Sequence, residues 1–186
     1  MTLTVCIPTF HKHELKAMSL MQQIAQLTKD LDVRIFKLPN KGEKTIGEYR
    51  QIMIDQVDTE YVVFIDADDR ISPKYFELVF DGIRKGVDAI GLKGEITTNG
   101  QRPFTFIHSS KYKKWADVRE KGKITYVRPI NHLNPIKTSI ARQIGYNNLR
   151  HGEDMDYSMR LSQSGLIKSE HFIDQVIYFY LYNSRK

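Results

Sequence analysis

The sequence predicts an α/β fold in which a mostly parallel sheet is flanked by helices, with a small antiparallel element in the second half. In the first half, short apolar runs alternate with segments whose apolar residues recur every three to four positions. In the second half, Asn99-Gly100 lies between two further runs, and this pair favours a tight hairpin turn. A chain of 186 residues is expected to form a single domain over residues 1–186.

Four strands are predicted in the first half from apolar runs of five to seven residues, at residues 3–9, 33–38, 61–65 and 87–92. The segments between them are long enough for the crossover connections that parallel neighbours need. In such a sheet, ligands bind beyond the carboxyl ends of the strands. Two of these ends carry Pro8-Thr9-Phe10 and Asp66-Ala67-Asp68-Asp69.

Three helices are predicted between these strands. The first carries an apolar stripe at Leu20, Ile24, Leu27 and Leu31. The second is expected from Thr45, which has capping-box spacing to Glu48, through about residue 56. The third is expected to start at Ser72-Pro73, because serine is a good N-cap and proline suits the first helical position.

The second half is less regular. A hairpin is expected from the runs at 95–98 and 103–107, and residues 111–123 are expected to form a short helix or a mobile loop. Thr138 is expected to cap a short helix through residue 143. A further helix from about Glu153 to Gly165 and a closing strand at 175–182 complete the prediction.

Charge is unevenly distributed along the chain. The formal net charge is +6, but residues 1–95 hold 13 Lys or Arg against 15 Asp or Glu, whereas residues 96–186 hold 15 against 7. Eleven of the basic residues lie within 102–150, a segment with only two acidic residues. The sequence therefore predicts an anionic partner that meets the second half of the molecule.

Several protein classes are excluded or disfavoured by composition. The longest apolar run, residues 176–182, is far shorter than the ~20 residues of a membrane-spanning helix, so no transmembrane segment is expected. Cys6 is the only cysteine, which rules out an intrachain disulfide and a thiolate zinc site. Without a cleavable signal pattern, a cytoplasmic location is expected.

An acidic loop, FIDADD at residues 64–69, follows the third predicted strand. Carboxylates this close together repel one another, and either a cation or a shared proton would relieve that repulsion. Mg²⁺ and Mn²⁺ prefer carboxylate oxygens and bridge to phosphates, so Asp66 and Asp68 could hold an ion that holds a diphosphate. The alternative is that Asp68 and Asp69 are solvated and Asp66 caps a turn.

A second acidic group, HGEDMD at residues 151–156, stands at the start of the last predicted helix. Taken alone it indicates simple N-terminal capping, because the helix dipole favours carboxylates in the first turn. It also follows the acidic loop and a first strand that ends in proline, and this combination favours a functional role over simple capping.

Three motifs in this order resemble those of family 2 glycosyltransferases with the GT-A fold. CIPTF at residues 6–10 resembles the family's first-strand motif, FIDADD at 64–69 its DxD motif, and GEDMD at 152–156 its late ED motif. Gly145-Tyr146 also matches the glycine-aromatic approach to the ED motif. The resemblance covers about residues 4–161 and implies a compact, Rossmann-like GT-A domain.

The resemblance implies a role for each matching residue on the donor side. Pro8, Thr9 and Phe10 would line the nucleotide pocket, and Asp66 would contact the ribose or the metal. Asp68 would ligate Mn²⁺ or Mg²⁺ at the diphosphate of a nucleotide-sugar donor, with a UDP-sugar favoured.

On the acceptor side, the resemblance makes Asp154 the general base and Glu153 its support or a contact to the acceptor. Arg50 would lie near the nucleotide, where the family often has a basic residue; for Lys44 a solvated helix face is preferred. Direct displacement with one base and one metal would invert the anomeric centre. Residues 1–95 would then bind the donor and residues 96–186 the acceptor.

This chain departs from the family pattern at two points. No acidic residue follows the second strand, where the family usually reads the base, so the sequence leaves the base open. The family often uses a late histidine as a third metal ligand. His132, His151 and His171 are candidates, but none lies in a matching motif.

The acceptor is predicted from the basic segment 102–150, in which Tyr112 and Trp115 are interleaved with Lys and Arg. This composition suits a phosphate backbone with an unstacked base. A hydroxymethylated base in DNA, of the kind that some phages glycosylate, would supply both the hydroxyl and the polyanion. A saccharide or lipid-linked acceptor is the alternative.

Two other function classes are open on sequence alone. FIDAD after a strand also resembles the nucleophile loop of haloacid-dehalogenase-like phosphatases, although Arg70 replaces the expected Thr or Val and that loop normally follows the first strand. A non-catalytic module that binds a nucleotide-sugar is the other class.

Overall fold

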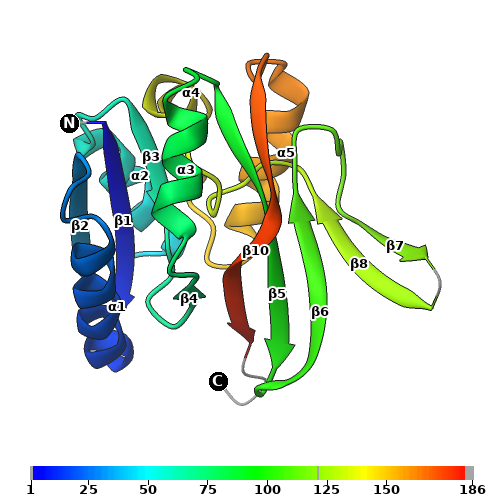
Figure 1. Cartoon of the computed structure of the whole chain (residues 1–186). Coiled ribbons are helices and arrows are strands. Elements are labelled where there is room, and N and C mark those ends of the chain that lie inside the picture. The colour runs from blue at the N-terminus through cyan, green and yellow to red at the C-terminus, as the bar shows by residue number, and fades with distance from the viewer. Residues whose placement is uncertain (1, 121, 183–186) are drawn as a thin grey trace.

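A single mixed sheet forms the centre of the computed structural model, which describes residues 2–120 and 122–182. Within this part of the chain, ten strands belong to the sheet, and eight of them follow the order β2-β1-β3-β9-β5-β6-β8-β7. The tenth strand, β10, pairs with β5 and with the short β4 (Figure 1). The predicted α/β class, with a parallel part and an antiparallel part, is confirmed.

The parallel part contains the first three predicted strands. β1 (Leu3–Phe10) lies between β2 (Val33–Asn40) and β3 (Tyr61–Phe64), and all three run in the same direction. Their carboxyl ends therefore meet at one edge of the sheet, the edge at which α/β proteins bind ligands.

The fourth predicted strand, β5 (Ala89–Thr98), is longer than expected and is not a direct neighbour of β3. The two-residue strand β9 (Ile136–Lys137) lies between them and is antiparallel to both. Because β3 and β5 are both antiparallel to β9, they run in the same direction. A strand of two residues carries no periodicity, so sequence analysis missed it.

Helices cover both faces of the sheet (Figure 1). The short helix η1 (His11–His13) leads into α1 (Glu14–Leu27), which shares one face with α3 (Tyr75–Ile83). The other face is covered by α2 (Ile46–Gln56), α4 (Thr138–Ile144) and α5 (Glu153–Ser164). Alternate residues of β1 serve the two cores, since Val5 packs on the first face and Cys6 on the second.

One of the three helix starts predicted from a capping residue is confirmed, and the other two helices begin at a different residue. α2 begins as predicted, since Thr45 and Glu48 form the complete capping box. α3 begins at Tyr75 instead of Pro73, because the carbonyl of Ser72 first accepts a turn hydrogen bond from the Tyr75 amide at 3.0 Å. Thr138 does not cap α4 but is its first residue, with its amide donating to the Glu60 carbonyl at 2.8 Å.

The first helix also ends earlier than its apolar stripe suggested. α1 ends at Leu27, and Leu31 lies beyond it while still packing on the same core. The Thr28 side chain and amide both donate to the Ile24 carbonyl, which closes the last turn of the helix.

The hairpin at Asn99-Gly100 is confirmed. It joins β5 to β6 (Gln101–His108), and both turn residues have positive φ, +52° for Asn99 and +74° for Gly100. This is the conformation that a tight two-residue turn requires and that asparagine and glycine adopt most readily.

The prediction of a helix or mobile loop at residues 111–123 is wrong for residues 116–120. These residues form strand β7 (Ala116–Glu120), which makes a hairpin with β8 (Lys123–Arg128), whereas residues 111–115 are turn and loop; Lys121 lies outside the described residues. β8 pairs with β6, so the ribbon extends the sheet as a projecting edge. Its polar, exposed side chains gave no apolar alternation from which a strand could be predicted.

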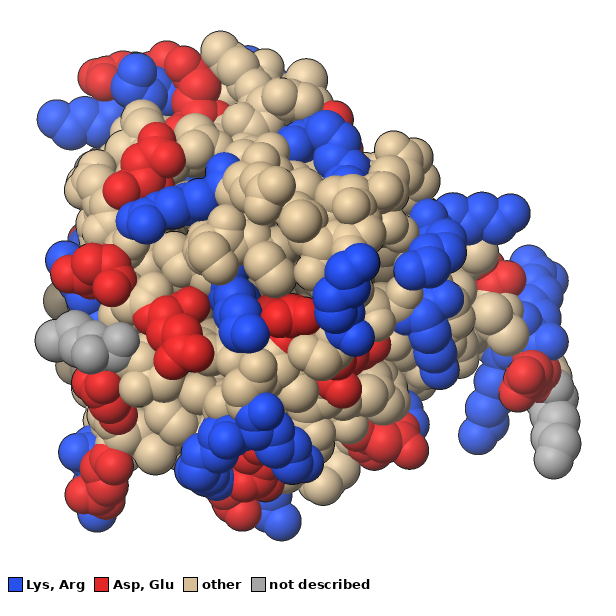
Figure 2. Space-filling view, turned by 90° about the horizontal axis from the view of Figure 1, so that it is seen from above, with Lys and Arg blue, Asp and Glu red and all other residues tan. Residues whose placement is uncertain are grey.

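Lys and Arg side chains predominate on this projecting ribbon in Figure 2, whereas both signs of charge are mixed over the rest of the face shown. The ribbon and the loop before it carry most of the basic surplus of the second half.

Among the described helices, none combines the length and the apolar character that crossing a membrane would need.

The closing strand β10 (Glu170–Tyr182) starts five residues before the predicted 175–182. It runs parallel to β5 with irregular register between Ile173 and Val176, where the polar Asp174 and Gln175 interrupt the apolar pattern. Its second half also pairs with β4 (Arg70–Ile71), which directly follows the acidic loop. The second half of β10 is thereby brought to the predicted functional edge, where Tyr180 and Leu181 line the cavity described below.

Candidate active site

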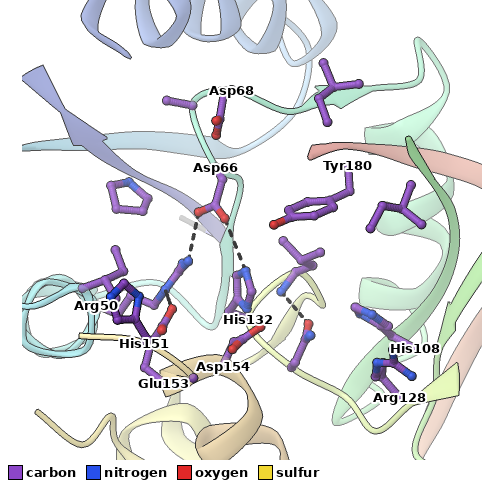
Figure 3. A pocket seen from close by; sticks show the side chains of 18 of the residues that line it. Arg50, Asp66, Asp68, His108, Arg128, His132, His151, Glu153, Asp154 and Tyr180 are labelled. Carbon is purple, nitrogen blue, oxygen red and sulfur yellow. Dashed lines mark hydrogen bonds and ion pairs between the residues drawn. The ribbon is translucent and has the colours of Figure 1, made fainter. Parts of the chain in front are cut away.

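A cavity of about 500 Å³ lies at the carboxyl ends of β1 and β3, a size typical of small-molecule sites (Figure 3). Its walls come from the first strand, the acidic loop, the start of α5 and the strands of the second half. Residues from these elements include Pro8, Phe10, Asp66, Asp68, Trp115, Tyr126, Arg128, Glu153 and Asp154. Most of the predicted site residues are therefore neighbours in space.

Thr9 is the exception among them. Pro8 and Phe10 line the cavity, but Thr9 is fully buried and its hydroxyl donates to the Ile7 carbonyl at 3.1 Å. Successive side chains of a strand point to opposite faces, so one residue of three turns away. The expectation that Thr9 lines the pocket is not met.

Asp66 is held by two cationic or polar neighbours. Its Oδ1 accepts from Arg50 Nη2 at 3.0 Å, and its Oδ2 lies 3.5 Å from His132 Nε2 (Figure 3). Burial acts to raise the pKa of Asp66, but the charges and hydrogen bonds of Arg50 and His132 outweigh it and hold the pKa well below its usual range. Asp66 is thus a fixed carboxylate at the cavity edge.

The other two carboxylates of the loop differ from each other. Asp68 lines the cavity, 3.5 Å from Nδ1 of His13 on η1. Asp69 points into the protein, where it accepts hydrogen bonds from the Tyr178 hydroxyl at 2.7 Å and the Leu181 amide at 3.0 Å. Burial, together with Asp66, raises the pKa of Asp69. Asp69 therefore ties the loop to β10, and the alternative that it is solvated is wrong.

The start of α5 also separates its carboxylates. Gly152 adopts φ +75° at the N-cap, and Asp154 lines the cavity while its Oδ1 accepts from the Met155 amide at 2.8 Å. Glu153 is buried, with Oε1 3.4 Å from Arg50 Nε. Asp156 turns away and pairs with Arg160 at 2.7 Å. Asp154 is thus the half-buried carboxylate that this helix presents to the cavity.

The two predicted basic contacts differ in position. Arg50 lines the cavity but is only 2% exposed, lying beneath Asp66 and Glu153. Its contact to a nucleotide stays a prediction. Lys44 is exposed and is not among the residues that line the cavity, which agrees with the preferred view of it as surface.

Three histidines were candidate metal ligands, and the structure separates them. His132 contacts Asp66, and His151 lines the cavity. His171 packs instead against Gly82 of α3, with Nδ1 3.2 Å from Lys85 Nζ.

Several residues of the cavity were not found from the sequence, namely His13, His108, Tyr126, Arg128 and Tyr180. None lies in a recognisable motif: His13 follows the first strand on η1, and the other four belong to strands of the second half. Burial, with His132 and Arg128 nearby, lowers the pKa of His108 to about 3, so this side chain is neutral. The sequence offers one signal for these residues, the alternation of side chains between the two faces of β6 and β8. This alternation does not indicate which face meets the cavity.

Arg128 and two aromatic residues form the wall that the ribbon contributes. The guanidinium carbon of Arg128 lies 4.5 Å from the centre of the Trp115 ring and 5.4 Å from that of Tyr126. The Trp115 indole donates to Ser158 Oγ at 2.8 Å, which fixes the base of the ribbon to α5. The basic, aromatic composition noted in the sequence therefore reaches the cavity.

No group of three or more His, Cys, Asp or Glu side chains within the described residues is arranged to hold a metal ion. Asp66 is engaged by Arg50 and His132, and Asp68 lines the cavity beside His13, so these two carboxylates are the ones that an ion at this edge would meet. Mg²⁺ commonly takes one or two carboxylates and completes its coordination with substrate phosphates and water. The residues fit an ion held jointly with a diphosphate rather than a preformed metal centre.

The sheet, with helices on both faces and an acidic cavity at the carboxyl ends of its parallel strands, has a GT-A-like fold. The sequence model described as glycosyl transferase family 2 matches residues 18–147, well over half of the chain. The protein therefore belongs to glycosyl transferase family 2.

Solved structures of TarS from S. aureus show the same fold. TarS 1–349 superimposes with a TM-score of 0.66 at 17% identity, and its complexes with UDP and with UDP-GlcNAc give 0.67 and 0.66, each at 18% identity. Each comparison covers 97% of this chain, but only 58–60% of the TarS chain. No curated protein matches by sequence.

Proposed function

We propose that this protein is a metal-dependent, inverting glycosyltransferase that moves a sugar from a nucleotide-sugar donor to an acceptor hydroxyl. One observation carries the proposal: Asp68, from the loop after β3, and Asp154, from the start of α5, line the same cavity. Membership of family 2 and the binding of UDP and UDP-GlcNAc by the similarly folded TarS support it.

On the donor side, residues 1–95 would bind the nucleotide-sugar, with a UDP-sugar favoured. Pro8 and Phe10 would pack against the nucleotide, and Asp66 would contact its ribose or assist Asp68 at the metal. A bound Mn²⁺ or Mg²⁺ would neutralise the charge that develops on the departing diphosphate.

On the acceptor side, Asp154 would remove the proton from the acceptor hydroxyl as that oxygen attacks the anomeric carbon. The bond between this carbon and the diphosphate oxygen breaks at the same time, so the configuration inverts. General-base catalysis of this kind contributes about 10²–10⁴-fold. Glu153, buried against Arg50, would support Asp154 rather than meet the acceptor itself.

The acceptor we propose is a hydroxymethylated base in DNA, approached through residues 96–186. The basic ribbon and the Trp115, Tyr126 and Arg128 wall support a partner that offers phosphates and a flat ring. A base within a duplex would have to be turned out of the helix to enter the cavity. A saccharide or lipid-linked acceptor is the competing case.

The donor is tested with a panel of nucleotide-sugars in the presence of Mn²⁺, with release of the free nucleotide as the measurement. Turnover of one donor, and its loss on chelation, is the expected result. Thermal stabilisation by a donor without any turnover would instead indicate the non-catalytic module. Hydrolysis of a generic phosphomonoester would indicate the phosphatase, which the pairing of Asp66 with Arg50 and His132 disfavours.

The acceptor is tested on the ribbon with two matched variants. Arg119 lies two positions from Asp117, the strand partner of Tyr126, so it shares the cavity-lining face, whereas Lys123 shares the opposite face. Arg119→Ala should weaken DNA binding and lower the salt slope of log K by about 1, and Lys123→Ala should do so less. Equal effects of both variants, or binding that is insensitive to salt, would contradict a DNA acceptor on this face.

A further inference from the structure

Arg50 joins the acidic loop to the start of α5. Its Nη2 donates to Asp66 at 3.0 Å and its Nε lies 3.4 Å from Glu153 Oε1. Figure 3 shows the Arg50 side chain between these two carboxylates. One side chain thus contacts both acidic motifs, which are almost ninety residues apart in the sequence.

The helix that carries Arg50 also holds the segment leading to α5. The Gly47 amide donates to the Leu149 carbonyl at 3.1 Å, and the Tyr146 amide donates to Gln51 Oε1 at 2.6 Å. Thr45, the cap of this helix, bonds the Asn148 side chain at 2.8 Å. Helix α2 is therefore a fixed platform for residues 145–149, and Arg50 extends that support to Glu153.

Burial makes Arg50 suited to this role. Its side chain is 3% exposed, and the guanidinium carbon lies 5.0 Å from the centre of the Phe64 ring. The planar guanidinium can face two carboxylates at once, which the single nitrogen of a lysine does not reproduce. Nη2 makes the hydrogen bond to Asp66 and Nε lies at ion-pair distance from Glu153, whereas Nη1 is buried without a hydrogen-bond partner among the described residues.

We propose that Arg50 is a positioning residue, which sets the start of α5 relative to the acidic loop and so fixes where Asp154 stands opposite Asp66 and Asp68. This inference rests on the proposed function. In its absence, the base and the donor loop would keep their chemistry but lose their alignment. A displacement of about 1 Å can cost about 100-fold in rate.

The test compares Arg50→Lys with Arg142→Lys. Arg142 holds the other end of α2 through the Ile54 carbonyl, at 3.3 Å, and does not line the cavity, so it controls for loosening of the helix. We expect Arg50→Lys to lower kcat by about 10–100-fold while the Kd for UDP, from calorimetry, changes less than about threefold. Arg142→Lys should leave both close to those of the unmodified protein.

A second variant and a second measurement complete the test. Glu153→Gln should lower kcat similarly, and the double variant with Arg50→Lys should be no worse than the poorer single variant. The rate of amide hydrogen exchange at residues 150–154 should rise in Arg50→Lys, and this measurement needs no acceptor. An unmodified protein that turns over no donor would refute the proposed function, not this inference.

Three results would overturn the inference. The first is a loss of UDP affinity in Arg50→Lys at unchanged kcat, because Arg50 would then be a nucleotide contact. The second is a multiplicative effect of Arg50→Lys and Glu153→Gln. The third is hydrogen exchange at residues 150–154 that is the same in Arg50→Lys and in the unmodified protein.

Discussion

Asp154 and Asp156 lie in the same helical turn but in different surroundings. Asp154 lines the cavity, whereas Asp156 is paired with Arg160 and with the Asn147 side chain. Both carboxylates satisfy the preference for acids at a helix start, but only Asp156 stands four residues before an arginine, the spacing of an ion pair within a helix. Arg160 also donates to the carbonyls of Ile144 and Gly145, so it holds Asp156 on that side of the helix while Asp154 lines the cavity.

Asp154→Asn should therefore lower kcat by about 10²–10⁴-fold, because the amide cannot accept the acceptor's proton. Donor affinity and melting temperature should change little. Asp156→Asn is the matched control, in which the melting temperature should fall because the pairing with Arg160 weakens, with a much smaller effect on kcat. Unchanged turnover in Asp154→Asn would remove this residue from the role of base.

His108 gives the protein a defined sensitivity to acid. Its pKa is about 3 in the folded protein against 6.5 as the ordinary value, so the unfolded chain takes up the proton first. The stability that depends on neutral His108 is complete above pH 6.5 and is lost as pH falls toward 3. Through this group, the free energy of unfolding should fall by about 1.4 kcal/mol per pH unit in that window.

The measurement is urea unfolding at pH 7 and pH 5 for the unmodified protein and for His108→Gln. Glutamine does not titrate, so the variant should lose less stability between the two pH values. Parallel losses in both proteins would show that His108 is not the source of the acid sensitivity.

At the scale of elements, α2 is the helix on which both acidic motifs depend. A Cβ on Gly47 would lie 2.0 Å from the Asn147 carbonyl oxygen, a backbone atom that cannot turn aside. Gly47 was not singled out by sequence analysis, because a glycine in a helix is locally only a weaker helix former. A glycine is required at position 47 because the backbone of residues 147–149 approaches it closely.

Gly47→Ala should destabilise the protein by about 1–3 kcal/mol through overpacking, although alanine is the better helix former. Gly86→Ala is the control, since a Cβ there meets nothing within 4 Å. Its destabilisation should come only from the backbone strain of a non-glycine residue at φ +68°. Denaturant unfolding measures both. A Gly47→Ala variant as stable as the unmodified protein would show that α2 and residues 147–149 separate easily.

The ribbon shows why one element was predicted wrongly. β7 is exposed along almost its whole length, so its side chains carry no buried face from which a strand could be read. Its conformation is set by β8, which is in turn set by β6. Pairing of this kind depends on distant residues and not on local propensity.

At the scale of the whole molecule, donor binding should link the acidic loop to overall stability. UDP at 100 times its Kd should stabilise the protein by about 2.7 kcal/mol, seen as a higher melting temperature. Part of this shift should require Mn²⁺ and disappear with a chelator. Asp68→Asn should lose the Mn²⁺-dependent part, whereas Asp58→Asn, at an exposed pair with Arg34, should keep it.

The same Mn²⁺-dependent shift in Asp68→Asn and in the unmodified protein would mean that Asp68 does not hold the ion. A shift that is independent of Mn²⁺ in every variant would mean that the nucleotide binds without a metal.

Sequence by itself determined the parts of this protein that follow from local chemistry. The parallel strands, the capping box at Thr45, the Asn99-Gly100 turn and the family motifs are each specified within a few residues, by periodicity, backbone preference or charge. Tertiary structure alone decided which of the carboxylates face the cavity and which are tied down. Asp69 and Glu153 are each engaged by a partner more than 100 residues away along the chain. The physical reason is that burial and ion pairing are properties of distant segments brought together, and no local pattern encodes the partner.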